Sequence, residues 1–128
     1  MHIPGNPGPI AIVEDDPVMG ALLVQMLGFR GLPAQLYSGG LALLKSDALP
    51  NYQTIVMDLS LPDMDGFELI QKLMDRVPQI GLLIMTGRGN ATLESARMVA
   101  EGLGGRVVGT LNKPFSHFEL CIALKLED

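Results

Sequence analysis

The sequence predicts an α/β fold in which a doubly wound parallel sheet of five strands is covered by helices on both faces. Three observations support this prediction. Five short apolar runs recur along the 128 residues. A stretch with apolar residues at helical three- and four-residue spacing follows each run. The connections are short, and because crossovers between parallel strands are right-handed, strict strand and helix alternation leaves few other arrangements.

The predicted strands are runs rich in Ile, Val, Leu or Met. They are IAIV at 10–13, AQLY at 34–37, TIVM at 54–57, GLLIM at 81–85 and VVGTL at 107–111. In sheets of this type ligands bind outside the carboxyl ends of the strands. The residues that directly follow each run are therefore the first candidates for a functional site.

Capping residues and helix breakers mark the predicted helices between these strands. Asp16 and Pro17 supply an N-cap and a first-turn proline for the first helix, which ends near Gly28. The remaining helices are predicted over residues 38–49, 66–77, 91–103 and from about 116. Pro78 ends the third of the five, because proline cannot continue a helix.

The amino-acid composition excludes several kinds of function and indicates a cellular location. The formal net charge is −5, with nine Lys and Arg residues scattered along the sequence, which argues against a nucleic-acid or anionic-membrane surface. The single cysteine excludes an internal disulfide, and with only two histidines there is no ligand set for structural zinc. We therefore expect a cytoplasmic protein, with residues 1–9 as a flexible tail, linker or expression remnant and one domain over 10–128.

Polar residues follow four of the five predicted strands. Glu14 and Asp15 follow the first, Asp58 the third, Thr86 the fourth and Lys113 the fifth. Because these strand ends share one edge of the sheet, the side chains converge. Clustered carboxylates repel one another unless a cation lies among them, and oxygen ligands without His or Cys favour Mg²⁺.

This set of groups suits a phosphoryl group. Asp58 would be the nucleophile, while Mg²⁺ and Lys113 would neutralise the equatorial oxygens. The hydroxyl of Thr86 would bond to one of those oxygens after attachment. The bond between Lys113 and Pro114 is a candidate cis peptide that would aim the ammonium group inward.

The motifs IVEDDP, MDLSLPDMDGFEL, IMTG and LNKPF resemble the receiver domains of bacterial two-component response regulators, over about residues 10–126. The resemblance implies a flavodoxin-like fold with sheet order 2-1-3-4-5 and phosphorylation by a sensor histidine kinase or phosphotransfer domain. It implies that Asp58 is the phosphoacceptor. Glu14, Asp15, Asp58 and the main-chain carbonyl of Ser60 match the Mg²⁺ ligands.

Thr86 and Lys113 match the hydroxyl and lysine that receive phosphoryl oxygens in this family. Thr110 is a departure, because many receivers carry a switching aromatic residue three positions before the lysine. We therefore expect the response to pass through the fourth helix, fifth strand and fifth helix, a face that would bind an output domain or form a homodimer. The fifth helix has more apolar residues than one core-facing stripe needs: Phe118, Leu120, Cys121, Ile122, Leu124 and Leu126.

The segment GLGGRVVGTLNKPF resembles receivers fused to cyclic-di-GMP phosphodiesterases, which suggests that kind of output domain. The receiver itself is expected to be no enzyme, at most capable of self-phosphorylation from small donors and slow autodephosphorylation. Two other functions stay open. An aspartate-nucleophile phosphatase needs a second Asp at the position of Ser60, and a phosphorylation-independent binding module would not need the intact acidic site. Asp63 and Asp65 are interpreted as loop-solvating residues.

Overall fold

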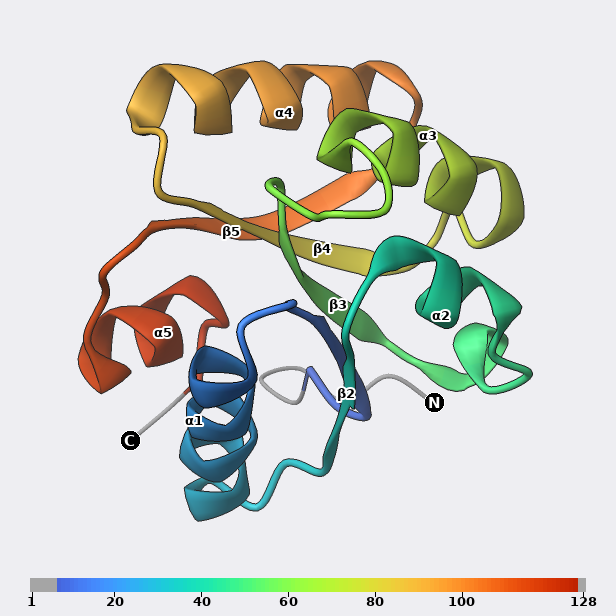
Figure 1. Ribbon diagram of the computed structural model, residues 1–128. Helices are drawn as coiled ribbons and strands as arrows, with labels where there is room; N and C mark the ends of the chain where they lie inside the picture. The colour runs from blue at the N-terminus through green and yellow to red at the C-terminus, as the bar shows by residue number, and fades with distance from the viewer. Residues whose placement is uncertain (1–6, 127–128) are drawn as a thin grey trace.

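The computed structural model describes residues 7–126, which form one parallel five-stranded sheet with helices on both faces (Figure 1). The strands are β1 (Ile10–Val13), β2 (Ala34–Tyr37), β3 (Thr54–Asp58), β4 (Gly81–Thr86) and β5 (Arg106–Asn112). The helices are α1 (Pro17–Phe29), α2 (Gly40–Lys45), α3 (Gly66–Arg76), α4 (Asn90–Gly102) and α5 (His117–Ala123), with a 3₁₀ turn η1 (Leu49–Asn51). The order β2-β1-β3-β4-β5 confirms the fold predicted from the sequence.

Two apolar layers lie on opposite faces of the sheet. Alternate residues of β1 separate into them, with Ala11 and Val13 on the side of α2, α3 and α4, and Ile10 and Ile12 on the side of α1 and α5. All residues of β1, β3 and β4 are buried, whereas β2 and β5 at the sheet edges are only partly buried. Burial on both faces explains why the central strands are continuous apolar runs rather than alternating ones.

Side-chain caps fix where α1, α3 and α5 begin. The carboxylate of Asp16 accepts a hydrogen bond from the backbone N–H of Val18 at 2.9 Å, as the sequence predicted for the first helix. At α5, Ser116 and Glu119 form a reciprocal capping box. The first residues of α1 and α5 therefore have defined positions beside the carboxyl ends of β1 and β5.

The helix predicted over 38–49 is shorter than expected. Regular helix ends at Lys45, and Ser46 is extended with ψ 129°. The Ser46 hydroxyl accepts a hydrogen bond from the N–H of Ala48 and bonds to the Tyr37 hydroxyl, so this turn has partners outside the helix. Pro50 also lacks the backbone N–H that would continue the hydrogen bonds of α2. The chain therefore closes with η1 instead of a longer α2.

The segment just before β1 is attached to the sheet. The carbonyl of Pro7 accepts a hydrogen bond from the Thr54 hydroxyl at 2.7 Å, and the carbonyl of Pro9 accepts one from the N–H of Gln53 at 2.9 Å. Residues 7–9, the last part of the stretch predicted as a flexible tail or linker, are thus bonded to the sheet, and residues 1–6 lie outside the described residues. Between residues 7 and 126, none of the helices has the length and apolar character to span a bilayer.

Candidate functional site

Four strand ends place polar side chains at one edge of the sheet. Asp58 and Thr86 are the last residues of β3 and β4, while Glu14 follows β1 and Lys113 follows β5. The exposed fractions of Glu14, Asp58 and Thr86 are 2%, 5% and 0%. Charged groups with so little solvent require partners. The sequence-predicted residues therefore do lie on neighbouring strand ends, in a largely dehydrated setting.

The ammonium group of Lys113 bridges two carboxylates. It donates to Asp58 Oδ2 at 2.6 Å and also to Glu14 Oε1. Burial alone would lower the pKa of Lys113, but the hydrogen bonds and charges of Asp58 and Glu14 outweigh burial and raise it. Lys113 therefore stays positively charged and holds the ends of β1, β3 and β5 together.

Backbone amides bind the other oxygens of the same two carboxylates. Ser60 N–H donates to Asp58 Oδ1 at 2.9 Å, and Asp16 N–H donates to Glu14 Oε2 at 3.3 Å. Burial raises the pKa of Glu14, and the hydrogen bond from Lys113 opposes this rise without cancelling it. Both carboxylates are thus held in defined orientations, and burial disfavours the ionised form of Glu14.

Three carboxylates form a candidate cation site. One oxygen each from Glu14, Asp15 and Asp58 lies within 4.8 Å of the others. Asp15 is exposed, whereas Glu14 and Asp58 are buried. An all-oxygen, anionic donor set with one solvent-facing member suits a hard, partly hydrated cation such as Mg²⁺. The chemistry of the donors therefore fits the ion that the sequence suggested.

Thr86 and the end of β5 are joined by a second set of bonds. The Thr86 hydroxyl accepts a hydrogen bond from Arg88 N–H at 3.1 Å, and the Thr86 carbonyl accepts one from Lys113 N–H at 2.8 Å. The side-chain amide of Asn112 donates to Asn90 Oδ1, at the first residue of α4. The loop after Thr86 is therefore tied to β5 at both of its ends.

The loop after Asp58 is held by close backbone packing. Gly66 N–H donates to the Leu59 carbonyl at 3.1 Å, and Ser60 pairs with Asp65 in an isolated bridge. A Cβ at Gly66 would lie 2.6 Å from Leu59 Cα, so any other residue would force the backbone apart. The glycine of the DLSLPDMDG motif is therefore explained by this contact.

Asp63 and Asp65 are capping residues, which corrects their interpretation as loop-solvating aspartates. Asp65 accepts a hydrogen bond from Phe67 N–H at 2.7 Å and begins α3. Asp63 accepts hydrogen bonds from the backbone N–H groups of Gly40 and Leu41 at 3.1 and 2.9 Å, at the start of α2. The Leu41 amide, more than any other donor, holds the pKa of Asp63 below its ordinary value. Asp63 thus joins the β3–α3 loop to α2.

The peptide bond between Lys113 and Pro114 is cis, as the sequence suggested. Three residues before Lys113, Thr110 lines a shallow hollow of about 230 Å³ together with Leu111, Glu119, Ile122 and Ala123. Position 110, where the resemblance led us to expect an aromatic residue, thus has open space between β5 and α5. Beside it, Phe118 and Ile122 of α5 are 68% and 58% exposed.

The sequence did not indicate how much of α1 is uncovered. Val18, Leu22 and Phe29 are 76%, 41% and 83% exposed, and α1 contains no charged residue. We call this set of residues, with the exposed Ala21 and Gln25 between them, the α1 outer face. Its first residue, Val18, lies three positions after Asp15, so the face adjoins the acidic site.

Comparison with known proteins agrees with this arrangement. A family model described as the response regulator receiver domain matches residues 10–125. The chain belongs to the response regulator receiver family. Among solved structures, this receiver domain is similar to a response regulator from Colwellia psychrerythraea, with 28% identity, a TM-score of 0.77 and coverage of 91% and 92% of the two chains. It is also similar to the non-phosphorylated HemR receiver domain of Leptospira biflexa, with 26% identity, a TM-score of 0.76 and coverage of 91% and 90%.

Curated relatives of this receiver domain include transcriptional regulatory proteins. TcrA of Mycobacterium tuberculosis is 33% identical over 116 residues, which cover 91% of this chain and 44% of TcrA. FixJ of Bradyrhizobium diazoefficiens is 32% identical over 110 residues, which cover 84% of this chain and 50% of FixJ. The chain thus spans about half the length of the curated relatives that it matches.

Proposed function

We propose that this receiver domain is a phosphorylation-dependent signalling switch that accepts a phosphoryl group on Asp58 from a sensor histidine kinase or a phosphotransfer domain. The observation that carries the proposal is the Lys113 ammonium group bonded to Asp58 Oδ2 at 2.6 Å. A buried carboxylate that already has a cation at hydrogen-bond distance is placed where negative charge would accumulate during phosphoryl transfer.

The proposed step moves one phosphoryl group between two partners. An oxygen of the Asp58 carboxylate attacks the phosphorus of a phosphohistidine, the phosphorus–nitrogen bond breaks, and its electron pair stays on the imidazole nitrogen. The ammonium group of Lys113 would then donate a hydrogen bond to a phosphoryl oxygen instead of to the carboxylate. Glu14, Asp15, Asp58 and the Ser60 carbonyl would hold Mg²⁺, which when bound supplies positive charge for the phosphoryl oxygens. Transfer ends with an acyl phosphate on Asp58.

The proposed switch begins at Thr86. Its hydroxyl would leave the Arg88 amide and donate to a phosphoryl oxygen, which frees the first turn of the loop that leads to α4. Asn112 and Asn90 would carry this change to the end of β5, because their side chains bond the two segments directly. This route needs no aromatic ring at position 110.

Two surfaces support proposed contacts with partners. The α1 outer face adjoins the acidic site and is proposed to contact the phosphodonor protein. The exposed Phe118 and Ile122 of α5 support a contact with an output domain or a homodimer through α4, β5 and α5. The GLGGRVVGTLNKPF resemblance supports a cyclic-di-GMP phosphodiesterase as the output, whereas the relatives TcrA and FixJ support a transcriptional output.

One observation favours a second function. Thr110 leaves the usual aromatic switch position as an open hollow, which is compatible with a phosphorylation-independent binding module. The two functions predict different results in one respect. A switch requires phosphorylation at Asp58 to change the structure of residues 86–90 and of β5, whereas a binding module does not.

Mass spectrometry with acetyl phosphate and Mg²⁺ tests the proposed function. We expect the wild-type protein to gain one phosphoryl group, Asp58→Asn to gain none, and Asp47→Asn, at an exposed position, to behave as wild type. Equal labelling of wild type and Asp58→Asn would contradict the assignment of Asp58. Labelling without any change in amide shifts over 86–112 would favour the binding module.

A further inference from the structure

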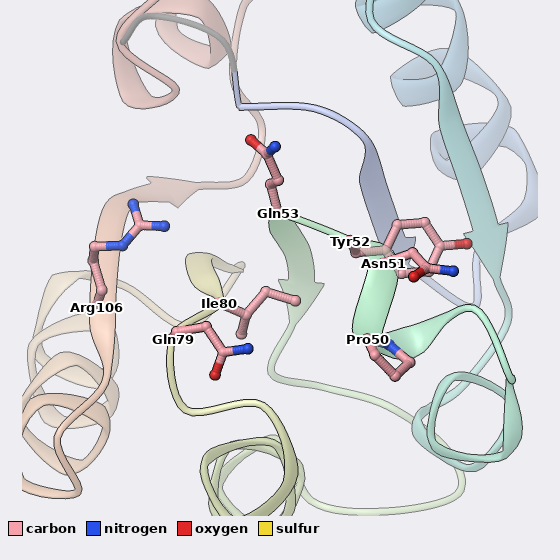
Figure 2. Close-up of a pocket in the computed structure, with 7 residues that line it drawn as sticks. All are labelled: Pro50, Asn51, Tyr52, Gln53, Gln79, Ile80 and Arg106. Carbon is pink, nitrogen blue, oxygen red and sulfur yellow. The ribbon is translucent and has the colours of Figure 1, made fainter. Parts of the chain in front are cut away.

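A pocket lies at the opposite edge of the sheet from Asp58, where the chain enters β3, β4 and β5. It has a volume of about 370 Å³ and is lined by Pro50, Asn51, Tyr52, Gln53, Gln79, Ile80 and Arg106. Figure 2 shows these side chains around one hollow, with Gln53, Gln79 and Arg106 supplied by three different strand-entry segments. None of the lining residues is acidic, and nothing in the function proposed for Asp58 uses them.

Arg106 gives the pocket its charge. Its guanidinium group has no hydrogen bond or ion pair to any residue between 7 and 126. It packs over Gly81, because a Cβ built at Gly81 would lie 3.1 Å from Arg106 Nη2 and 3.3 Å from Cζ. The absence of a side chain at Gly81 thus makes room for the guanidinium group beside the pocket. An arginine without a carboxylate partner presents five donors in a planar fork that matches a carboxylate.

The other lining residues offer neutral amides and apolar walls. Asn51, Gln53 and Gln79 each carry one side-chain amide, a group that both donates and accepts hydrogen bonds. Ile80 is 3% exposed. The Tyr52 hydroxyl forms a hydrogen bond with the Tyr37 hydroxyl at 2.7 Å, and Tyr37 does not line the pocket. Burial, and then the Tyr37 hydrogen bond, raise the pKa of Tyr52 to about 12, so it adds no negative charge near neutral pH.

We propose that this pocket, which we call the amino-edge pocket, binds an acidic residue of a peptide segment, with Arg106 on the carboxylate and the side-chain amides of Gln79 and Asn51 on the flanking peptide groups. One guanidinium group balances one negative charge, which matches a carboxylate rather than a phosphate dianion. Neutral amides beside it match the donors and acceptors of a peptide backbone. A volume of about 370 Å³ is within the range of ligand pockets, roughly 300–1,000 Å³, and accommodates one such residue.

Amide-shift titration of the ¹⁵N-labelled protein tests the proposal. The probe is acetyl-Gly-Glu-Gly-amide, with acetyl-Gly-Gln-Gly-amide as the neutral counterpart and propionate as a carboxylate without peptide groups. We expect the Glu peptide to shift the amides of Gln53, Gln79 and Arg106 saturably at concentrations up to roughly 10 mM. We expect both the Gln peptide and propionate to bind at least about tenfold more weakly, because a charged hydrogen bond or the amide contacts are lost.

Variants of the pocket complete the test. Arg106→Gln should weaken binding of the Glu peptide about tenfold or more, and Gly81→Ala should weaken it by displacing the guanidinium group. Arg97→Gln, at an arginine of α4 that lies outside the pocket and pairs with Glu94 and Glu101, is the control and should bind as wild type. Asp58→Asn should also bind as wild type, because the pocket is independent of the phosphoacceptor. Equal binding of the Gln peptide, unchanged affinity in Arg106→Gln, or no saturable shift at the pocket would overturn the proposal.

Discussion

Lys113 Nζ lies 2.6 Å from Asp58 Oδ2 and bonds to Glu14 as well, so one ammonium group serves two buried carboxylates from different strands. Without the lysine these carboxylates would repel each other in a dehydrated site. Lys113 is therefore a structural residue of the resting domain as well as a proposed partner of the phosphoryl group. The two roles can be separated, because the first requires neither Mg²⁺ nor a phosphodonor.

Replacement of Lys113 by Met tests the structural role. In the absence of divalent ions we expect the free energy of unfolding at pH 7 to fall by about 2 kcal/mol. This loss is smaller than the loss on breaking a fully buried ion pair, because the lysine side chain is 21% exposed. Urea unfolding followed by circular dichroism measures this change. Lys72→Met, at an exposed lysine of α3, is the control and should change stability by less than about 0.5 kcal/mol. Equal stability of the two variants would contradict the structural role.

Glu14→Gln tests the pH dependence of the site. The pKa of Glu14 is raised in the folded protein, so the folded state binds this proton more tightly than the unfolded state, and stability falls as the pH rises through the folded pKa. We expect Glu14→Gln to be more stable than wild type near pH 7 without metal, and this advantage to disappear below the ordinary pKa of about 4.5. The measurement is urea unfolding at several pH values.

The matched control for Glu14 is Glu94→Gln at an exposed position of α4, which removes a carboxylate of the same type outside the site. A Glu14→Gln variant that loses stability at pH 7 would show that pairing with Lys113 outweighs the cost of burying the charge.

Asp15 is predicted to hold the divalent cation. We expect Asp15→Ala to weaken Mg²⁺ binding at least about tenfold, because a hydrated Mg²⁺ gives up water reluctantly and the variant offers one carboxylate fewer. Asp16→Asn should bind Mg²⁺ as wild type, since Asp16 caps α1 and asparagine preserves the cap. Calorimetry and amide-shift titration both report the affinity. Retained affinity in Asp15→Ala together with loss in Asp16→Asn would assign the ligand role to Asp16.

Asn112→Ala tests the connection between the site and α4. The variant loses the bond to Asn90, so we expect faster amide hydrogen exchange over residues 87–92 with a global stability loss of about 1 kcal/mol. With Mg²⁺ and beryllofluoride, the shifts at Asp58 should persist while those in the first turn of α4 shrink. Asn51→Ala, at an exposed residue of η1, serves as the control. Unaltered beryllofluoride shifts in α4 would remove Asn112 from the proposed route.

The strands were predictable from sequence nearly to the residue, because central parallel strands are continuous apolar runs bounded by polar residues. Glu14, Asp58, Thr86 and Lys113 were found for the same reason, since strand ends in a parallel sheet share one edge. Asp63 was misinterpreted because the amides it caps, at Gly40 and Leu41, lie more than twenty positions earlier. Local spacing carries no signal for a cap that arrives from another loop.

The amino-edge pocket and the α1 outer face escaped prediction for a related reason. Arg106 looks like an ordinary surface charge in the sequence, and only the packing over Gly81 shows how it is placed. The apolar spacing of α1 predicted a helix but not which residues stay uncovered. Leu22 has the spacing of a core residue, yet it is 41% exposed, because the sheet and α5 cover only part of the helix surface.

The absence of charge on α1 has a consequence for the effect of ionic strength on this protein. The contacts of Lys113 with Glu14 and Asp58 are electrostatic, and so is the binding of a charged ligand to Arg106. Dissolved salt screens such attractions where solvent reaches them. An interface formed on Val18, Leu22 and Phe29 receives no charged side chain from α1, and sulfate or phosphate salts strengthen apolar contacts. A complex built on α1 would thus persist or tighten in concentrated salt, under conditions that weaken the binding of a charged ligand to the exposed Arg106.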